Sequence, residues 1–236
     1  MNTIEFAVPY KHDRSRHAAV QVFDHLRSMI ISLSLKPGTV LPRLELADYF
    51  ALSLTPIRDA LLRLEEEGLV DIFPQHATVV RQIDVMSARQ AHFLRLSMEL
   101  EIVHTLARAR PPELVRNLRA TIALQQAADA ASDVDRFSQA DLDFHRQMYQ
   151  AAHVEALWDL LRSKSGNLDR LRRLHLQVPI VRKAASILDD HAAIVDAIEQ
   201  NDAALAQQCV RAHLSGTLAQ LDEIRARYPE FLLDAA

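Results

Sequence analysis

The feature that most constrains the fold is a single pair of strand-like runs in an otherwise helical sequence. "LVDIF" (69–73) and "TVVRQI" (78–83) are rich in β-branched residues and flank the loop "PQHA", which is typical of a small hairpin. Apolar residues recur at helical spacing before this pair, and no strand pattern is left after Ser87. Only 4 glycines occur in 236 residues, which disfavours a sheet protein with many turns. The chain is therefore expected to be mainly α-helical.

Three helices are expected before the hairpin, at about 18–34, at about 43–50, and from the turn "ALSL" to about Glu67. Ser53 or Thr55 is expected to cap the third helix, and Gly68 to end it. Three helices followed by a two-stranded hairpin is the order of a winged helix-turn-helix domain. In that fold the third helix enters the major groove of DNA by its N-terminal end.

The remainder of the chain predicts an antiparallel bundle of six helices joined by short loops. They are expected at about 87–109, 112–131, 134–152, 154–175, 180–200 and 202–227. The sequence thus predicts two domains. Residues 1–82 form a winged helix-turn-helix DNA-binding domain, and residues 83–236 form a helical domain for effector binding and dimerisation.

Charge and composition limit the classes of function. The net charge is −4, and residues 1–82 hold 9 Lys and Arg against 10 Asp and Glu, so the basic footprint of many DNA-binding domains is missing. The one cysteine, Cys209, excludes an internal disulfide and suits a reducing cytoplasm. We expect no membrane span, because no apolar run approaches 18 residues. The N-terminus lacks the apolar core of a signal peptide, so a cytoplasmic protein is expected.

Polar residues at the start of the third helix are candidates for DNA contact. Ser53 and Thr55 carry short hydroxyls that can bond phosphates, beside the free N–H groups of a helix N-terminus. Arg58 follows one turn later and can reach a phosphate or a guanine edge. His76 at the hairpin tip can reach the minor groove or backbone. The alternative is ordinary helix capping with a solvated arginine.

One aspartate and three histidines are candidates for a metal site in the bundle. Asp141 and His145 are four residues apart and share a helix face with apolar residues. His191 and His213 fall in the apolar stripes of two further helices. Burying several imidazoles without partners would be costly, and one shared divalent metal would satisfy all four groups. The alternative is that each histidine bonds a backbone carbonyl or a nearby carboxylate.

Residues 20–81 resemble the DNA-binding domain of the GntR superfamily through the run "PGTVLPRLELADYFALSLTPIRDALLRLEEEGLVDIFPQHATVV". The later stretches "RLSMELEIVHTLA", "ADLDFHRQMYQAA", "DDHAAIVDAIEQND" and "VRAHL" resemble the all-helical (FCD) ligand-sensing domain of its FadR-like branch. The resemblance implies a transcriptional regulator that binds a palindromic DNA operator as a homodimer. It further implies repression that is relieved by a small effector.

The resemblance also implies roles for individual residues. Many members of this branch bind a metal through an Asp and three His, which correspond here to Asp141, His145, His191 and His213. Such a ligand set suits Zn, Ni, Mn or Fe and leaves room for a small carboxylate. Arg95 fits the "Arg-x-x-x-Glu" of the first bundle helix. Apart from the resemblance, Glu99, Asn167 and Arg172 are expected to line the same cavity. The alternative for these charged and polar residues is surface salt bridges, above all for Arg172 in the run "DRLRRLH".

The sequence departs from the family pattern at four positions in the first domain. Leu54 stands where an arginine that contacts DNA is usual, and Ala51 and Ala77 stand where glycine is usual. Arg43 stands where glutamate is common and can partly compensate for the missing arginine. Loss of one cationic contact would weaken phosphate binding or change the base that is read.

Two other functions remain open from the residues. The first is a metal-dependent enzyme acting on small organic acids, although the sequence shows no nucleophile motif and no phosphate loop. The second is a helical interaction module that has lost DNA binding. The leading expectation is a regulator and not an enzyme.

Overall fold

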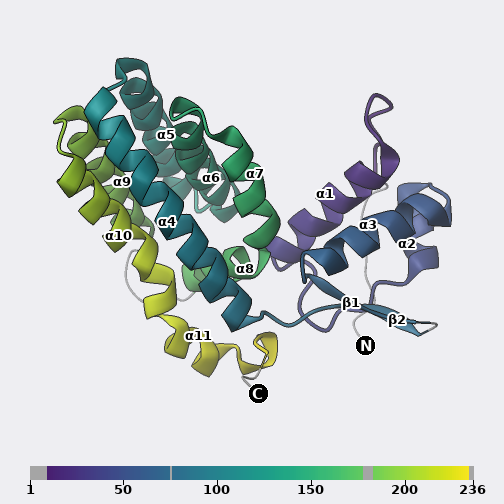
Figure 1. Ribbon diagram of the computed structural model, residues 1–236. Coiled ribbons are helices and arrows are strands. Elements are labelled where there is room, and N and C mark those ends of the chain that lie inside the picture. The colour runs from purple at the N-terminus through teal and green to yellow at the C-terminus, as the bar shows by residue number, and fades with distance from the viewer. Residues whose placement is uncertain (1–9, 75, 178–182, 234–236) are drawn as a thin grey trace. The chain divides into compact units, whose positions relative to one another are not determined.

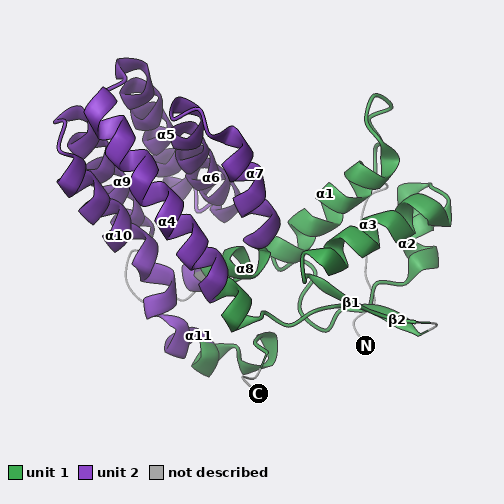
Figure 2. Ribbon diagram, in the orientation of Figure 1, with its two compact units in different colours: residues 1–88, 166–173, 225–236 green, residues 89–165, 174–224 purple. Residues whose placement is uncertain are grey.

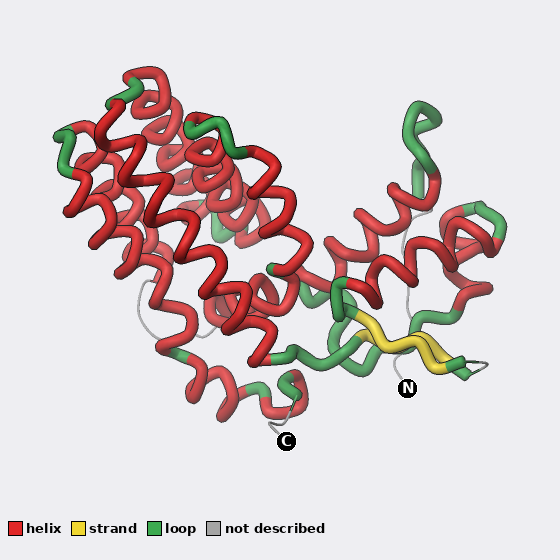
Figure 3. Tube along the Cα trace, in the orientation of Figure 1, coloured by secondary structure: helices red, strands yellow, loops and turns green. Residues whose placement is uncertain are grey.

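The structure is a computed structural model that describes residues 10–74, 76–177 and 183–233. The chain divides into two compact units, which Figure 2 colours separately. Unit 1 comprises Met1–Ala88, Gly166–Arg173 and Arg225–Ala236, and unit 2 comprises Arg89–Ser165 and Leu174–Ile224. The expected mainly helical fold is confirmed, because the described part of the chain has one short hairpin and is otherwise helix and loop (Figure 3).

Unit 1 contains a winged helix-turn-helix in the expected order (Figure 1). Its elements are α1 (Ala18–Ile31), α2 (Arg43–Phe50), α3 (Leu54–Glu66), β1 (Val70–Phe73) and β2 (Ala77–Val80). The strands pair antiparallel from Val70 opposite Val80 to Phe73 opposite Ala77, and Val40 adds one bridge to Val79. The apolar stripe of α3 closes the core of this unit through Ile57, Ala60, Leu61 and Leu64.

A left-handed residue follows each of the helices α2 and α3. Gly68 has φ 69° after α3, where the amide of Gly68 bonds the carbonyl of Glu65 and that of Leu69 bonds Leu64. This is the Schellman arrangement in which glycine is favoured. The turn after α2 repeats it at Ala51, with φ 50°, although alanine is strained in this conformation. The sharp turn between α2 and α3 therefore forms without the glycine usual at this position.

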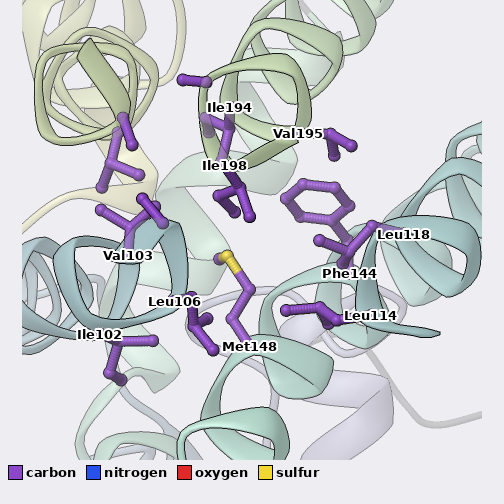
Figure 4. Packing of buried hydrophobic residues seen from close by; sticks show 14 of the residues in the cluster. Ile102, Val103, Leu106, Leu114, Leu118, Phe144, Met148, Ile194, Val195 and Ile198 are labelled. Carbon is purple, nitrogen blue, oxygen red and sulfur yellow. The ribbon is translucent and has the colours of Figure 1, made fainter. Parts of the chain in front are cut away.

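The helical part of the chain follows the hairpin. Its helices are α4 (Val85–Ala109), α5 (Pro112–Ala130), α6 (Val134–Ala151), α7 (Glu155–Lys164), α8 (Gly166–Gln177), α9 (Lys183–Glu199), α10 (Ala203–Ala219) and α11 (Leu221–Arg227), and a 3-10 turn covers Pro229–Phe231. Figure 4 shows the core of unit 2, where Phe144 and Met148 of α6 lie among Leu118 of α5 and Ile194 and Ile198 of α9. This core holds the inward face of α6 in place.

Two of the six expected bundle helices were wrong in extent. The helix expected over 154–175 is broken between α7 and α8, and the one expected over 202–227 is broken at Gln220. At the first break Gly166 approaches Leu69 so closely that a Cβ would lie 2.8 Å from Leu69 Cδ2. Neither glycine nor proline marks the second break, so helical periodicity runs through it. No helix in the described residues is long and apolar enough to span a membrane.

Later parts of the chain return to unit 1, so its boundary differs from the expected division at residue 82. The buried Arg170 donates from Nη1 to the carbonyl of Arg81 at 2.6 Å, and from Nη2 to Asn167 Oδ1 at 2.6 Å. Asn167 Oδ1 also accepts from the amide of Asp84 at 3.0 Å. Ile83 also forms a parallel bridge with Leu232, which lies near the C-terminus. Unit 1 is therefore built from three separate stretches of sequence.

Candidate functional site

The four residues Asp141, His145, His191 and His213 come together inside unit 2. Each offers one ligand atom, and these atoms lie within 4.8 Å of one another. Helix α6 contributes Asp141 and His145 from its buried face, since residues four apart lie one turn from each other. His191 comes from α9 and His213 from α10, and both side chains are buried. The sequence spacing thus located a real cluster.

The three imidazoles point the same nitrogen at a common centre. His213 Nε2 lies 3.2 Å from His145 Nε2 and 3.3 Å from His191 Nε2. Asp141 Oδ1 lies 3.7 Å from His191 Nε2. Ligand nitrogens bound at the usual 2.0–2.1 Å to one tetrahedral metal ion would be separated by about 3.3 Å. The spacing of the imidazole nitrogens therefore fits one shared metal ion.

The other ring nitrogen of each histidine faces an acceptor. His145 Nδ1 donates to Glu99 Oε2 at 2.8 Å, and His191 Nδ1 donates to Gln125 Oε1 at 2.8 Å. His213 Nδ1 lies 3.4 Å from Asp190 Oδ2. These acceptors keep the proton on Nδ1 and leave Nε2 with a lone pair, as in metal-binding histidines generally. Neutral rings in this tautomer turn lone pairs toward one another through Nε2, an arrangement that a shared cation would stabilise.

Electrostatics keep the histidine neutral and the carboxylate charged. Burial lowers the pKa of His145 to about 4, although Glu99 opposes this shift. Burial alone would raise the pKa of Glu99, but Arg95 and His145 outweigh it and lower the value to about 2. A neutral imidazole backed by a carboxylate is the form that binds a metal.

Arg95 lies beside the cluster as a buried cation. Its Nε donates to Glu99 Oε1 at 2.7 Å, so Glu99 joins Arg95 to His145. Burial opposes the charge, but Glu99 and Asp141 together raise the pKa of Arg95. Within the described residues Arg95 Nη2 is buried without a hydrogen-bond partner, and so is the hydroxyl of Tyr149. Two unsatisfied donors near Glu99 suit an anionic ligand with acceptor oxygens.

The other two expected effector residues lie on α8. Asn167 and Arg172 belong to unit 1, where Asn167 is engaged by Asp84 and Arg170. Two residues that were not expected face the outer nitrogens of the histidines, namely Gln125 and Asp190. A polar residue in the apolar stripe of α5 is the sequence signal that would have indicated Gln125.

The expected DNA-contacting residues lie on the exposed side of the winged domain. Ser53 occupies the N-cap position of α3 but makes no side-chain capping bond, so the expectation that it accepts an amide there was wrong. Thr55 lies inside the helix rather than at its cap. Both hydroxyls face solvent, as do the remaining candidates, Arg43, Leu54, Arg58 and His76.

Comparison with known proteins identifies both parts of the chain. Residues 18–80 match "Bacterial regulatory proteins, gntR family", and residues 90–216 match the "FCD domain". An HTH-type transcriptional regulator from an unstable DNA locus of Streptomyces ambofaciens is 33% identical, over 91% of this chain and 90% of the relative. The HTH-type transcriptional repressor RspR of Escherichia coli is 26% identical, over 87% of this chain and 89% of RspR.

The solved structure of E. coli McbR/YncC has the same fold, with a TM-score of 0.76 and 19% identity over 88% of this chain and 98% of that one. The sequence relatives are transcriptional regulators and not enzymes, so the enzyme alternative is set aside.

Proposed function

The chain belongs to the GntR family of bacterial regulatory proteins and carries an FCD domain, and from this premise we propose that it is a metal-dependent repressor responding to a small carboxylate. It binds a palindromic operator as a homodimer in the cytoplasm, with one winged domain on each half-site. The observation that carries the proposal is the convergence of three imidazole Nε2 atoms beside Asp141, with Arg95 next to them.

The proposed ligands are Asp141, His145, His191 and His213, and the ion is Zn, Ni, Mn or Fe. A bound ion would act as a Lewis acid, with a coordination position left for a carboxylate oxygen of the effector. One carboxylate and three neutral imidazoles leave a divalent ion with a formal charge near +1, which favours an anion. Glu99 holds His145 and Arg95 in position, and Arg95 binds the second end of the effector through Nη2. The proposal omits Asn167 and Arg172.

The proposed DNA contacts are Arg43, Ser53, Leu54, Thr55, Arg58 and His76. Effector binding releases DNA only if the effector has different affinities for the DNA-bound and the free conformation. A repressor of this type therefore binds its effector less tightly when it is held on DNA.

Elemental analysis of the purified protein beside a His145→Ala, His191→Ala double variant tests the metal. We expect about one ion per chain, lost in the double variant. No metal in either protein after loading with Zn, Ni and Mn would refute the metal part of the proposal.

A second experiment tests the effector. A panel of small mono- and dicarboxylates is screened for release of a selected DNA duplex, and fluorescence anisotropy measures the release. The test variant is Arg95→Met, which removes the charge but keeps an apolar side chain of similar length. A carboxylate that releases DNA from the wild-type protein should be at least tenfold weaker on this variant, since a buried charge-assisted contact contributes about 1.5–3 kcal/mol. Equal release from both proteins would exclude Arg95 as the effector anchor.

A further inference from the structure

Leucine side chains are exposed at the N-terminal ends of α2 and α3 in the winged domain. Leu54, the first residue of α3, is 49% exposed, and Leu44, the second residue of α2, is 70% exposed. Along α3, Leu54, Arg58 and Leu62 are four residues apart and form one exposed stripe. The buried residues of α3 hold the helix on the domain, so Leu54 is not needed for that packing.

The position of Leu54 at the start of α3 limits which groups of DNA its side chain can contact. In a winged helix-turn-helix the N-terminal end of the third helix enters the major groove and contacts base edges. The C5-methyl group of thymine is the apolar group presented there, whereas the other base pairs present polar donors and acceptors. A branched aliphatic side chain has no hydrogen bond to offer a guanine or an adenine. Thymine is therefore the base whose edge complements Leu54.

We propose that Leu54 reads a thymine methyl group in each operator half-site, and that this contact determines base specificity where a cationic residue would select guanine. The inference rests on the operator-binding part of the proposed function. Arg58, one turn further along the same stripe, supplies the neighbouring polar contact. Leu62 lies about 12 Å further along the helix axis and has no such role.

The test begins with selection from a pool of randomised duplexes, using the full-length protein at one fixed salt concentration. The enriched duplex is then synthesised with each thymine replaced in turn by uracil, which removes only the methyl group. Affinities are measured for the wild-type protein, Leu54→Ala and the matched control Leu62→Ala. Both leucines are exposed on the same helix, so the two variants differ mainly in distance from the N-terminal end.

We expect uracil at one thymine of a half-site to weaken wild-type binding about fourfold, the value that about 0.8 kcal/mol for one buried methyl group gives. The same replacement should have no effect on Leu54→Ala and the full effect on Leu62→Ala. A Leu54→Arg variant should select guanine at that position.

Other outcomes separate the inference from its premise. If no duplex is enriched, the operator-binding proposal is refuted. If a duplex is enriched but no uracil replacement depends on Leu54, DNA binding stands and the thymine contact is wrong. Loss of the methyl effect in Leu62→Ala as well would also overturn the inference, because the effect would then not be specific to Leu54.

Discussion

Replacing Gln125 with leucine should weaken metal binding although Gln125 is not one of the proposed ligands. Gln125 Oε1 accepts the Nδ1 hydrogen of His191 at 2.8 Å, and both side chains are buried. Without metal, His191 of the variant can move its proton to Nε2. Metal binding requires Nε2 to be free, which forces the Nδ1 hydrogen to remain buried without an acceptor.

The magnitude follows from this difference between the two states. A buried unsatisfied donor costs about 1–3 kcal/mol, which corresponds to a loss of about 5- to 140-fold in affinity. Residues that orient metal-binding histidines through a hydrogen bond generally contribute a factor of about 10 to 100 to metal affinity. Leucine is close to glutamine in size, so the fold should be retained.

The assay is competition for Zn with a chromophoric chelator of known affinity. Gln147→Leu is the matched control, because Gln147 of α6 donates to Thr121 Oγ1 of α5, a hydrogen bond that involves none of the proposed ligands. We expect the control to bind metal like the wild type. If Gln125→Leu also bound one ion per chain with unchanged affinity, the reasoning that Gln125 fixes the tautomer of His191 would be refuted.

Three further predictions concern the winged unit. Ala51→Gly should stabilise the protein by about 0.5–1 kcal/mol in denaturant unfolding. The substitution relieves about 1–2 kcal/mol of strain in the left-handed backbone and costs about 0.5–1 kcal/mol in chain entropy. An unchanged midpoint of unfolding would contradict this prediction. Gly166→Ala should destabilise by about 1–3 kcal/mol, because its Cβ would lie 2.8 Å from Leu69 Cδ2, whereas Gly216→Ala meets nothing within 4 Å and should not destabilise. Arg58→Ala should reduce the slope of log affinity against log salt by about 1 in DNA binding if it contacts a phosphate, and an unchanged slope would exclude that contact.

Local patterns predicted what depends on helix faces and on turns. The stripe that contains Asp141 and His145 is buried as expected, because apolar neighbours at helical spacing leave no other face for the core. The same holds for α3 and for the glycine that ends it. These features depend on residues within a few positions of one another.

Features that depend on distant contacts could not be predicted in this way. The break before Gly166 reflects packing against Leu69, and Arg170 reaches a carbonyl 89 residues earlier in the chain. Periodicity carries no information on such partners. Gln125 and Asp190 were missed for the same reason, since an acceptor is recognised only once its histidine is placed beside it.

The three-part make-up of unit 1 has a consequence for protein synthesis. The amide of Ile83 bonds the carbonyl of Phe231, and the amide of Leu233 bonds the carbonyl of Ile83. The ribosome makes α1 to β2 long before Phe231 and Leu233, so unit 1 gains these hydrogen bonds only after all of unit 2 has been translated. Chains that end before Phe231 lack these bonds, so unit 1 is complete only in a molecule that also contains unit 2.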